Sequence, residues 1–185
     1  MPRATLTTIE LVKLRIKMED SALKGHSRLE SAQWVFERQI SWINGADVKV
    51  GVIVALDLAL IGGLASAFNI SDEASRYWWT YALIGATALL LALALLFAAI
   101  ALNPKTNGPA QSLLFFGPIS KKIVFDYQSQ FLAATEEELL LDWTQQIHRN
   151  ALIACDKYRF VRRSMTCSFL ASVPWIAAVA FLMKF

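Results

Sequence analysis

The chain of 185 residues has room for one domain, and its 56% hydrophobic content and mean hydropathy of +0.43 are too apolar for an ordinary soluble fold. It is an integral membrane protein. The formal net charge of +3 is spread over several predicted helices, which argues against nucleic-acid binding. The two cysteines, Cys155 and Cys167, lie on one predicted helix, cannot reach each other, and lack the matching histidine pair of a metal site.

Residues 1–26 mix basic and apolar positions and are compatible with either a strand or an interfacial helix. We expect no cleaved secretion signal, because the first long apolar run follows about forty mixed polar residues. From about Ser27, apolar residues recur every three or four positions, which predicts a helix that continues into the membrane. We therefore divide the chain into an N-terminal cytoplasmic segment, 1–26, and a three-span domain, 27–183.

Three apolar runs are long enough to cross a bilayer, which needs about 18 to 20 helical residues. They predict spans at about 48–68, 78–102 and 164–183. Trp78 and Trp79 are typical of the aromatic anchors at a membrane surface and mark the outer edge of the second span. The predicted fold class is an all-α membrane protein with three transmembrane helices and a cytoplasmic helical stalk.

The stalk is predicted within the segment 103–163. Thr135 and Glu138 form a capping box that starts a helix, and no breaker follows before Pro174, so one helix should continue through the third span. This helix and the one at 27–47 each carry an apolar stripe. We expect them to pack side by side, and the surface that two helices leave uncovered predicts a homo-oligomer.

Basic residues indicate the orientation in the membrane. Eight Lys or Arg lie in residues 1–49 and eight in 103–163, whereas only Arg76 and Lys184 lie elsewhere. The positive-inside rule therefore predicts a multi-pass membrane protein with its N-terminus and the segment 103–163 in the cytoplasm and its C-terminus across the membrane.

Small residues occupy every fourth position of the first span: Gly51, Ala55, Ala59 and Gly63. This spacing lets two membrane helices approach closely. The pattern leaves open whether the contact is made within one chain or between chains.

An acid, Asp57, lies near the middle of the same span and points away from the small residues. A charged Asp there costs about 2.5 to 3.5 kcal/mol, so it should be protonated, hydrogen-bonded or in contact with water. One interpretation is a neutral acid bonded to Thr87, Ser168 or Ser172. The other is a polar lining in an assembled or opened state.

At the cytoplasmic end of the first span, Asn44 and Asp47 share a helix face and Lys49 lies close by. Matching of depth places Asp47 near Arg162 or Arg159. The simplest interpretation is topology control with one ion pair.

His148 and Asn150 lie on the stalk helix, where a lone His is usually a polar surface residue. The sequence contains no Ser-His-Asp set, paired-carboxylate site, Gly-rich phosphate loop or metal cluster. We expect no enzyme activity, no metal and no resident cofactor.

Three stretches together resemble the Pycsar transmembrane effector family of bacterial anti-phage proteins. "NGADVKVG" is similar to its Asn-x-x-Asp-x-Lys start of the first span, "SLLFFGPIS" to its Pro-Leu-Phe-Phe-Gly type segment, and "QIHRNALIACDKYRFVRRS" to its Gln-x-x-x-Asn and Lys-Tyr-x-x-x-Arg pattern. The resemblance covers about residues 35 to 183, in order and with compatible spacing. The family-like residues are Asn44, Asp47, Lys49, Asn150, Lys157, Tyr158 and Arg162.

The resemblance implies an antiviral, abortive-infection effector that disrupts the inner membrane. In that family a nucleotide cyclase senses infection, and its product, cyclic CMP or cyclic UMP, acts on the effector directly or through a partner. The expected partners are the lipid bilayer, further copies of the chain and the product of a cyclase. The resemblance also makes the predicted contact between Asp47 and Arg162 an element of the membrane-inserted core.

Two departures from the family matter. Many relatives carry a separate nucleotide-binding domain, for which 185 residues with three spans leave no room, so the sensor would be residues 1–26, an oligomeric cytoplasmic cleft or another protein. A neutral polar residue is expected near position 57, where this chain has an acid. Two other functions stay open: a non-toxic membrane scaffold that recruits a cytoplasmic partner, and a small ion or proton channel.

Overall fold

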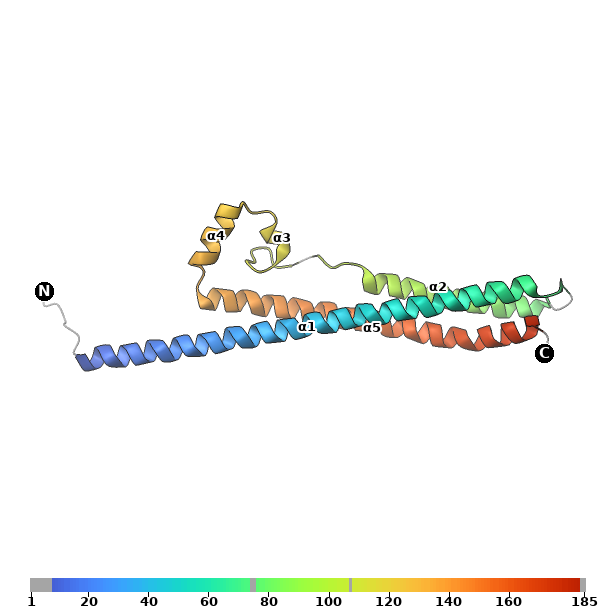
Figure 1. The fold of residues 1–185 in the computed structure, drawn as a ribbon, viewed down its shortest axis with the longest axis horizontal. Helices are drawn as coiled ribbons and strands as arrows, with labels where there is room; N and C mark the ends of the chain where they lie inside the picture. The colour runs from blue at the N-terminus through green and yellow to red at the C-terminus, as the bar shows by residue number, and fades with distance from the viewer. Residues whose placement is uncertain (1–7, 74–75, 107, 184–185) are drawn as a thin grey trace. The chain divides into compact units, whose positions relative to one another are not determined.

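The computed structural model describes residues 8–73, 76–106 and 108–183, and these ranges contain helices and no strand (Figure 1). The helices are α1 (Thr8–Ile70), α2 (Trp78–Leu102), α3 (Phe116–Ile119), α4 (Val124–Ala133) and α5 (Glu136–Met183). The predicted all-α class is confirmed. The chain divides into a first unit, residues 1–40 with 106–151, and a second unit, residues 41–105 with 152–185.

Helix α1 is continuous from Thr8 to Ile70. Of the two alternatives for residues 1–26, the helix is therefore found over 8–26, while residues 1–7 lie outside the described residues. No proline occurs between Thr8 and Ile70, so nothing in the sequence forces a break at Ser27, where the clear periodicity begins. Helix α5 is likewise one helix through Pro174, as predicted.

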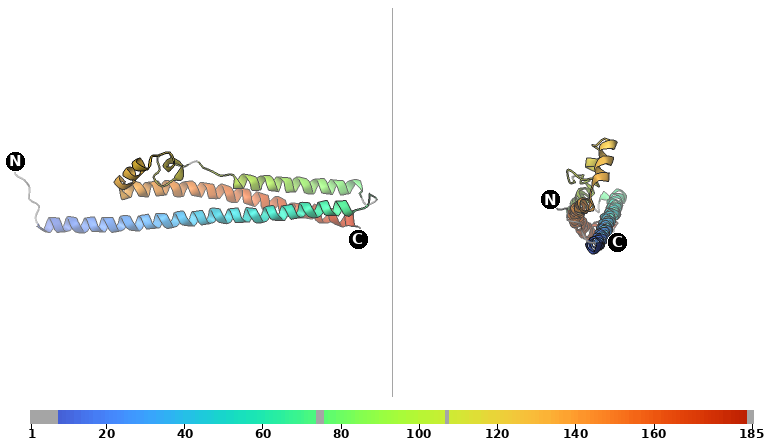
Figure 2. Two further views of the ribbon diagram at one scale, coloured as in Figure 1. Left: turned by 45° about the horizontal axis from the view of Figure 1, so that its top comes forward. Right: turned by 90° about the vertical axis from the view of Figure 1, so that its left-hand side faces the viewer.

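In the second unit, α2 lies beside the C-terminal parts of α1 and α5 (Figures 1 and 2). Two clusters of buried, mostly small apolar residues join the three helices. One contains Ala46, Val50, Ile53, Ala98, Ala101 and Val161, and the other contains Leu64, Ala67, Ala178 and Leu182. Alanine at so many contacts allows close helix approach, which is how membrane helices gain packing energy without a hydrophobic driving force.

The outer surface of this unit is apolar. Val48, Val52, Leu89, Phe169 and Val173 are all more than half exposed. Three helical stretches are each long and apolar enough to cross a membrane: Ser27–Ile70 within α1, Trp78–Leu102, which is α2, and Glu136–Met183, which is α5. The three predicted spans are therefore present, and their exposed side chains form a surface suited to lipid.

Arg76 closes the short connection between α1 and α2. Its guanidinium donates to the carbonyl oxygens of Phe68 and Ser71 and lies 4.4 Å from the centre of the Phe68 ring. These bonds satisfy carbonyl groups at the C-terminal end of α1 that lack helical partners. Trp78 and Tyr81, just beyond, are exposed as expected of interfacial anchors.

In the first unit, α1 and α5 pack through Phe36 and Trp143, whose ring centres are 4.8 Å apart in an edge-to-face arrangement. The predicted side-by-side packing of the two helices is therefore seen in this contact. Buried Ala32 of α1 and Gln146 of α5 belong to the same unit.

Asp142 of α5 holds the segment that contains "SLLFFGPIS". Its Oδ2 accepts hydrogen bonds from the Ser112 hydroxyl at 2.9 Å and from the amides of Leu113 and Leu114 at 2.7 and 3.2 Å. The Gln146 amide also donates to the Ser112 hydroxyl. One carboxylate thus orders this loop against α5 by charge-assisted bonds to backbone groups.

The predicted capping box starts α5. The Thr135 amide donates to Glu138 Oε2 at 2.8 Å, the Thr135 hydroxyl does so at 3.1 Å, and the Glu138 amide donates back to that hydroxyl at 3.3 Å. The bond from the Thr135 amide, followed by that from its hydroxyl, lowers the pKa of Glu138 below its ordinary value of 4.5.

The capping box should weaken in acid. Because the folded pKa of Glu138 is lowered, its contribution is complete above the unfolded value of 4.5 and is lost as the pH falls through the folded pKa. We expect hydrogen exchange of the amides at 136–139 to speed up in this window relative to Glu138→Gln, which has no charge to lose. Equal pH profiles for the two proteins would contradict the cap.

Removing the Asp142 carboxylate should release the loop at 112–114. Asp142→Ala deletes three hydrogen bonds to one charged group, and we expect a loss of about 3 kcal/mol of local stability, measured as hydrogen-exchange protection of the Leu113 and Leu114 amides. Asp142→Asn, which keeps an acceptor oxygen, should cost less. Asp126→Ala, at an exposed position of α4, is the control and should leave these two amides unchanged.

Candidate functional site in the membrane-spanning unit

A layer of buried polar side chains crosses the three helices of the second unit. Asp57 of α1, Thr87 of α2, and Ser164 and Ser168 of α5 are each at most 2% exposed. On α1 and α5 these residues fall between the members of one apolar cluster and those of the other, and on α2 Thr87 falls between Ala98 of the first cluster and Leu83 and Ile84, which pack against the second. The intramembrane acid therefore lies inside the three-helix packing and away from the outer surface.

The hydroxyl groups of this layer donate to backbone carbonyls and not to Asp57. The bonds run from Thr87 to Leu83 at 2.9 Å, from Ser164 to Ala94 at 2.8 Å, from Ser168 to Ser164 at 3.1 Å and from Ser172 to Ser168 at 3.2 Å. Ser168 is also the hydroxyl that interacts with Asp57. Neither Asp57 oxygen meets the geometry of a hydrogen bond with a partner among the described residues, so a neutral acid bonded to a neighbouring hydroxyl has only the nearness of Ser168 in its favour.

The small residues of the first span are divided between two surroundings. Gly51, Ala55 and Ala59 are exposed, and a Cβ at Gly51 would meet nothing within 4 Å. Gly63 is exposed as well, but a Cβ there would lie 3.1 Å from the Trp175 ring, whose Nε1 donates to a carbonyl of α1 at 2.8 Å. Gly63 therefore makes a contact within the chain, whereas Gly51, Ala55 and Ala59 form an exposed surface of small residues.

The ion pair at the N-terminal end of the first span joins Asp47 and Lys157. The prediction that Asp47 contacts Arg162 or Arg159 is wrong. Lys157 precedes Arg159 by two residues and Arg162 by five, about 3 and 7.5 Å along a helix, so the packing of α1 on α5 differs from simple depth matching by one of these amounts. The Lys157 side chain is 11% exposed and that of Asp47 is 36% exposed.

Tyr158 of α5 makes a second contact with α1, next to this ion pair. Its hydroxyl donates to the carbonyl of Trp42 at 3.2 Å, and the Lys49 ammonium lies 5.2 Å from the centre of its ring. Two of the three family-like stretches, "NGADVKVG" and "KYRFVRR", therefore meet across α1 and α5. Asn44 is exposed and takes no part in the ion pair.

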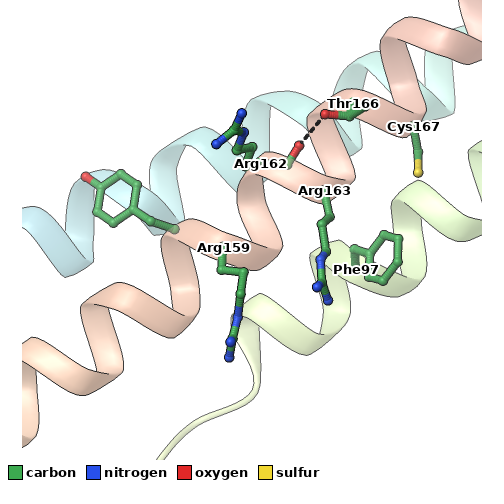
Figure 3. Close-up of a pocket in the computed structure, with 7 residues that line it drawn as sticks. Phe97, Arg159, Arg162, Arg163, Thr166 and Cys167 are labelled. Carbon is green, nitrogen blue, oxygen red and sulfur yellow. Dashed lines mark hydrogen bonds between the residues drawn. The ribbon is translucent and has the colours of Figure 1, made fainter.

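Arg159 and Arg162 line a pocket of about 690 Å³ on the second unit, together with Phe97 of α2 and α5 residues between Tyr158 and Cys167 (Figure 3). Arg159 itself is bonded to Asp156 at 2.6 Å. His148 is exposed and Asn150 half-buried, and both belong to the first unit. The described residues contain no cluster that could hold a metal ion.

Sequence reasoning missed two contributors, Ser164, which bonds α5 to α2, and Asp142, which holds the loop, and it gave Arg163, which lines the pocket, no role beyond marking the end of a span. Ser164 and Arg163 border an apolar run, and Asp142 lies in a polar helix. A serine, an aspartate or an arginine at such places is common, so no local pattern marks them.

The chain was compared with models of protein families, with curated proteins and with solved structures. Residues 31–184 match the model of a family described as Pycsar effector protein domain. No curated protein and no solved structure was found to match the chain. The matched range includes every candidate residue named above, and it agrees with the resemblance found over residues 35 to 183.

The new ion pair can be tested with a double-mutant cycle on unfolding in mild detergent. Asp47→Ala should destabilise more than Lys157→Met, because it strands the more buried of the two charges. The pair should show a coupling energy of about 1 to 2 kcal/mol, whereas Asp47→Ala and Arg162→Gln should be additive within about 0.5 kcal/mol. Stronger coupling to Arg162 than to Lys157 would refute the pairing.

Proposed function

We propose that this chain, which belongs to the Pycsar effector protein family, impairs the bacterial inner membrane when a cyclic-nucleotide signal changes its assembly. Membership makes it a membrane-bound effector of cyclic-nucleotide-signalled defence against phage, and the family is not a known enzyme family. The proposal adds the mechanism: membrane damage by a rearranged homo-oligomer, so that the infected cell stops before phage mature.

The observation that carries this proposal is the buried, unpartnered carboxyl of Asp57. A buried polar group without a hydrogen-bond partner costs about 1 to 3 kcal/mol. The packing of α1, α2 and α5 around it is therefore weakened at one point. A second arrangement in which Asp57 meets water would recover this free energy, which brings the two arrangements close enough in energy for a ligand to choose between them.

The exposed small residues of the first span suit the assembly step. Gly51, Ala55 and Ala59 leave α1 without bulky side chains along one line of the outer surface. A helix from a second copy can approach such a line closely, and packing of this kind is the main source of association between membrane helices. We propose that this line holds protomers together in the active assembly.

The signal in this proposal is cyclic CMP or cyclic UMP, recognised directly or through a partner on the cytoplasmic side. The distribution of basic residues supports a cytoplasmic N-terminus and a periplasmic C-terminus, so residues 1–49 and 103–163 would face the cyclase product. To switch the protein, the nucleotide has to bind the active assembly more tightly than the resting one.

A small ion or proton channel is the second candidate, and the layer of Asp57, Thr87, Ser164 and Ser168 favours it. In a channel, this acid would be needed for every conduction event. In an effector that is switched by assembly, it would only set the threshold at which the switch occurs.

Dye release from proteoliposomes tests the proposal and separates the candidates. Wild-type protein should release a trapped dye at high protein density or when cyclic CMP or cyclic UMP is added. Ala59→Leu, which fills the exposed line, should reduce release at least tenfold. Ala86→Leu adds the same bulk at an exposed position of α2 and should behave as wild type.

Asp57→Asn should shift the density or nucleotide concentration at which release begins without abolishing it. Abolished ion flux with intact assembly would favour the channel. If no dye or ion leaks at any density with either nucleotide, the membrane-impairing function is wrong, and recruitment of a partner by a scaffold becomes the better description.

A further inference from the structure

The pocket beside Phe97 carries an excess of positive charge. Arg159 and Arg163 are four residues apart on α5 and so share a helix face. Figure 3 shows their side chains extending to the same side of α5, with that of Arg162 pointing another way. Lys105, which follows α2, and Arg159 both pair with Asp156.

The Arg163 guanidinium is held by aromatic rings and has no carboxylate partner among the residues that the structure describes. It lies 6.0 Å from the ring centre of Phe97 and 5.6 Å from that of Phe160. Contact with two aromatic faces restricts its position without neutralising its charge. Lys105, Arg159 and Arg163 carry three positive charges, and Asp156 supplies one negative charge against them. The pocket can therefore accept an anion.

The chemistry of the pocket matches a phosphodiester. A guanidinium presents several N–H donors in a plane and binds two phosphate oxygens at once, so Arg159 and Arg163 together can hold one phosphate group. Basic pockets between membrane helices on the cytoplasmic side are typical binding sites for anionic lipid headgroups. Phe97 and Cys167, the other wall, belong to apolar spans.

We propose that this pocket binds an anionic phospholipid, with its phosphodiester on Arg159 and Arg163 and an acyl chain along Phe97 and Cys167. Arg163 is the last charged residue before the uncharged run at 164–183, so the pocket passes from the headgroup level to the hydrocarbon. A soluble cyclic nucleotide shares the phosphodiester but would place the remaining ribose hydroxyl and the polar edge of the base against this apolar wall. The site is independent of whether the protein damages membranes.

Native mass spectrometry of the full chain in neutral detergent tests the site. Dioctanoyl phosphatidylglycerol, dioctanoyl phosphatidylcholine and cyclic CMP are titrated separately. Wild-type protein should prefer phosphatidylglycerol to phosphatidylcholine, and Arg159→Gln with Arg163→Gln should weaken phosphatidylglycerol binding about tenfold or more. Arg28→Gln with Arg38→Gln removes the same charge from exposed positions of the first unit and should bind as wild type.

Arg159→Lys with Arg163→Lys keeps the charge but removes the planar donors, so its affinity should fall between those of wild type and the Gln variant. It also keeps the test valid if the Gln variant fails to fold. Equal binding of the two lipids by wild type, or equal phosphatidylglycerol binding by wild type and the Lys variant, overturns the proposal. Tight binding of cyclic CMP that displaces the lipid would assign the pocket to a soluble phosphodiester instead.

Discussion

The second unit depends on packing three apolar helices around a carboxyl group that has no hydrogen-bond partner there. Thr87, Ser164 and Ser168 surround the level of Asp57, yet each gives its hydrogen to a backbone carbonyl. Helical carbonyls are always within reach of a Ser or Thr on the same or a neighbouring turn, so they compete with the acid for these donors. The acid is therefore buried by the apolar clusters on either side of it and not by polar contacts of its own.

Charged and polar side chains join α1 to α5 at the end of the unit that contains Asp47. The ion pair between Asp47 and Lys157 and the bond from Tyr158 to the carbonyl of Trp42 both join α1 to α5 at one level. Polar contacts cost less free energy at the end of a span than in the hydrocarbon, because the headgroup region and water are near. These two contacts lie beside the apolar cluster of Ala46, Val50 and Val161, whose fit sets the register of the two helices and so which residues meet at the depth of Asp57.

Three surfaces of the second unit then have separate uses in our account. The buried layer around Asp57 destabilises the resting packing of the helices. The exposed line at Gly51, Ala55 and Ala59 is where a helix of another copy would pack. The pocket at Arg159 and Arg163 would bind anionic lipid. The family membership gives the biological setting, and these surfaces give physical means by which a signal could change the assembly.

Sequence alone determined the class, the three spans, the continuous α5 and the capping box at Thr135 and Glu138, because each follows from local rules: the length of an apolar run, the absence of a breaker, or a side chain three residues from its partner. It also placed Asp57 opposite the small residues. It did not determine that Asp47 meets Lys157, 110 residues away, or that the loop at Ser112 rests on Asp142. Only the tertiary structure decided these contacts, because the register of two distant helices is set by how small side chains such as Ala46, Val50 and Val161 fit together, and no local pattern encodes that fit.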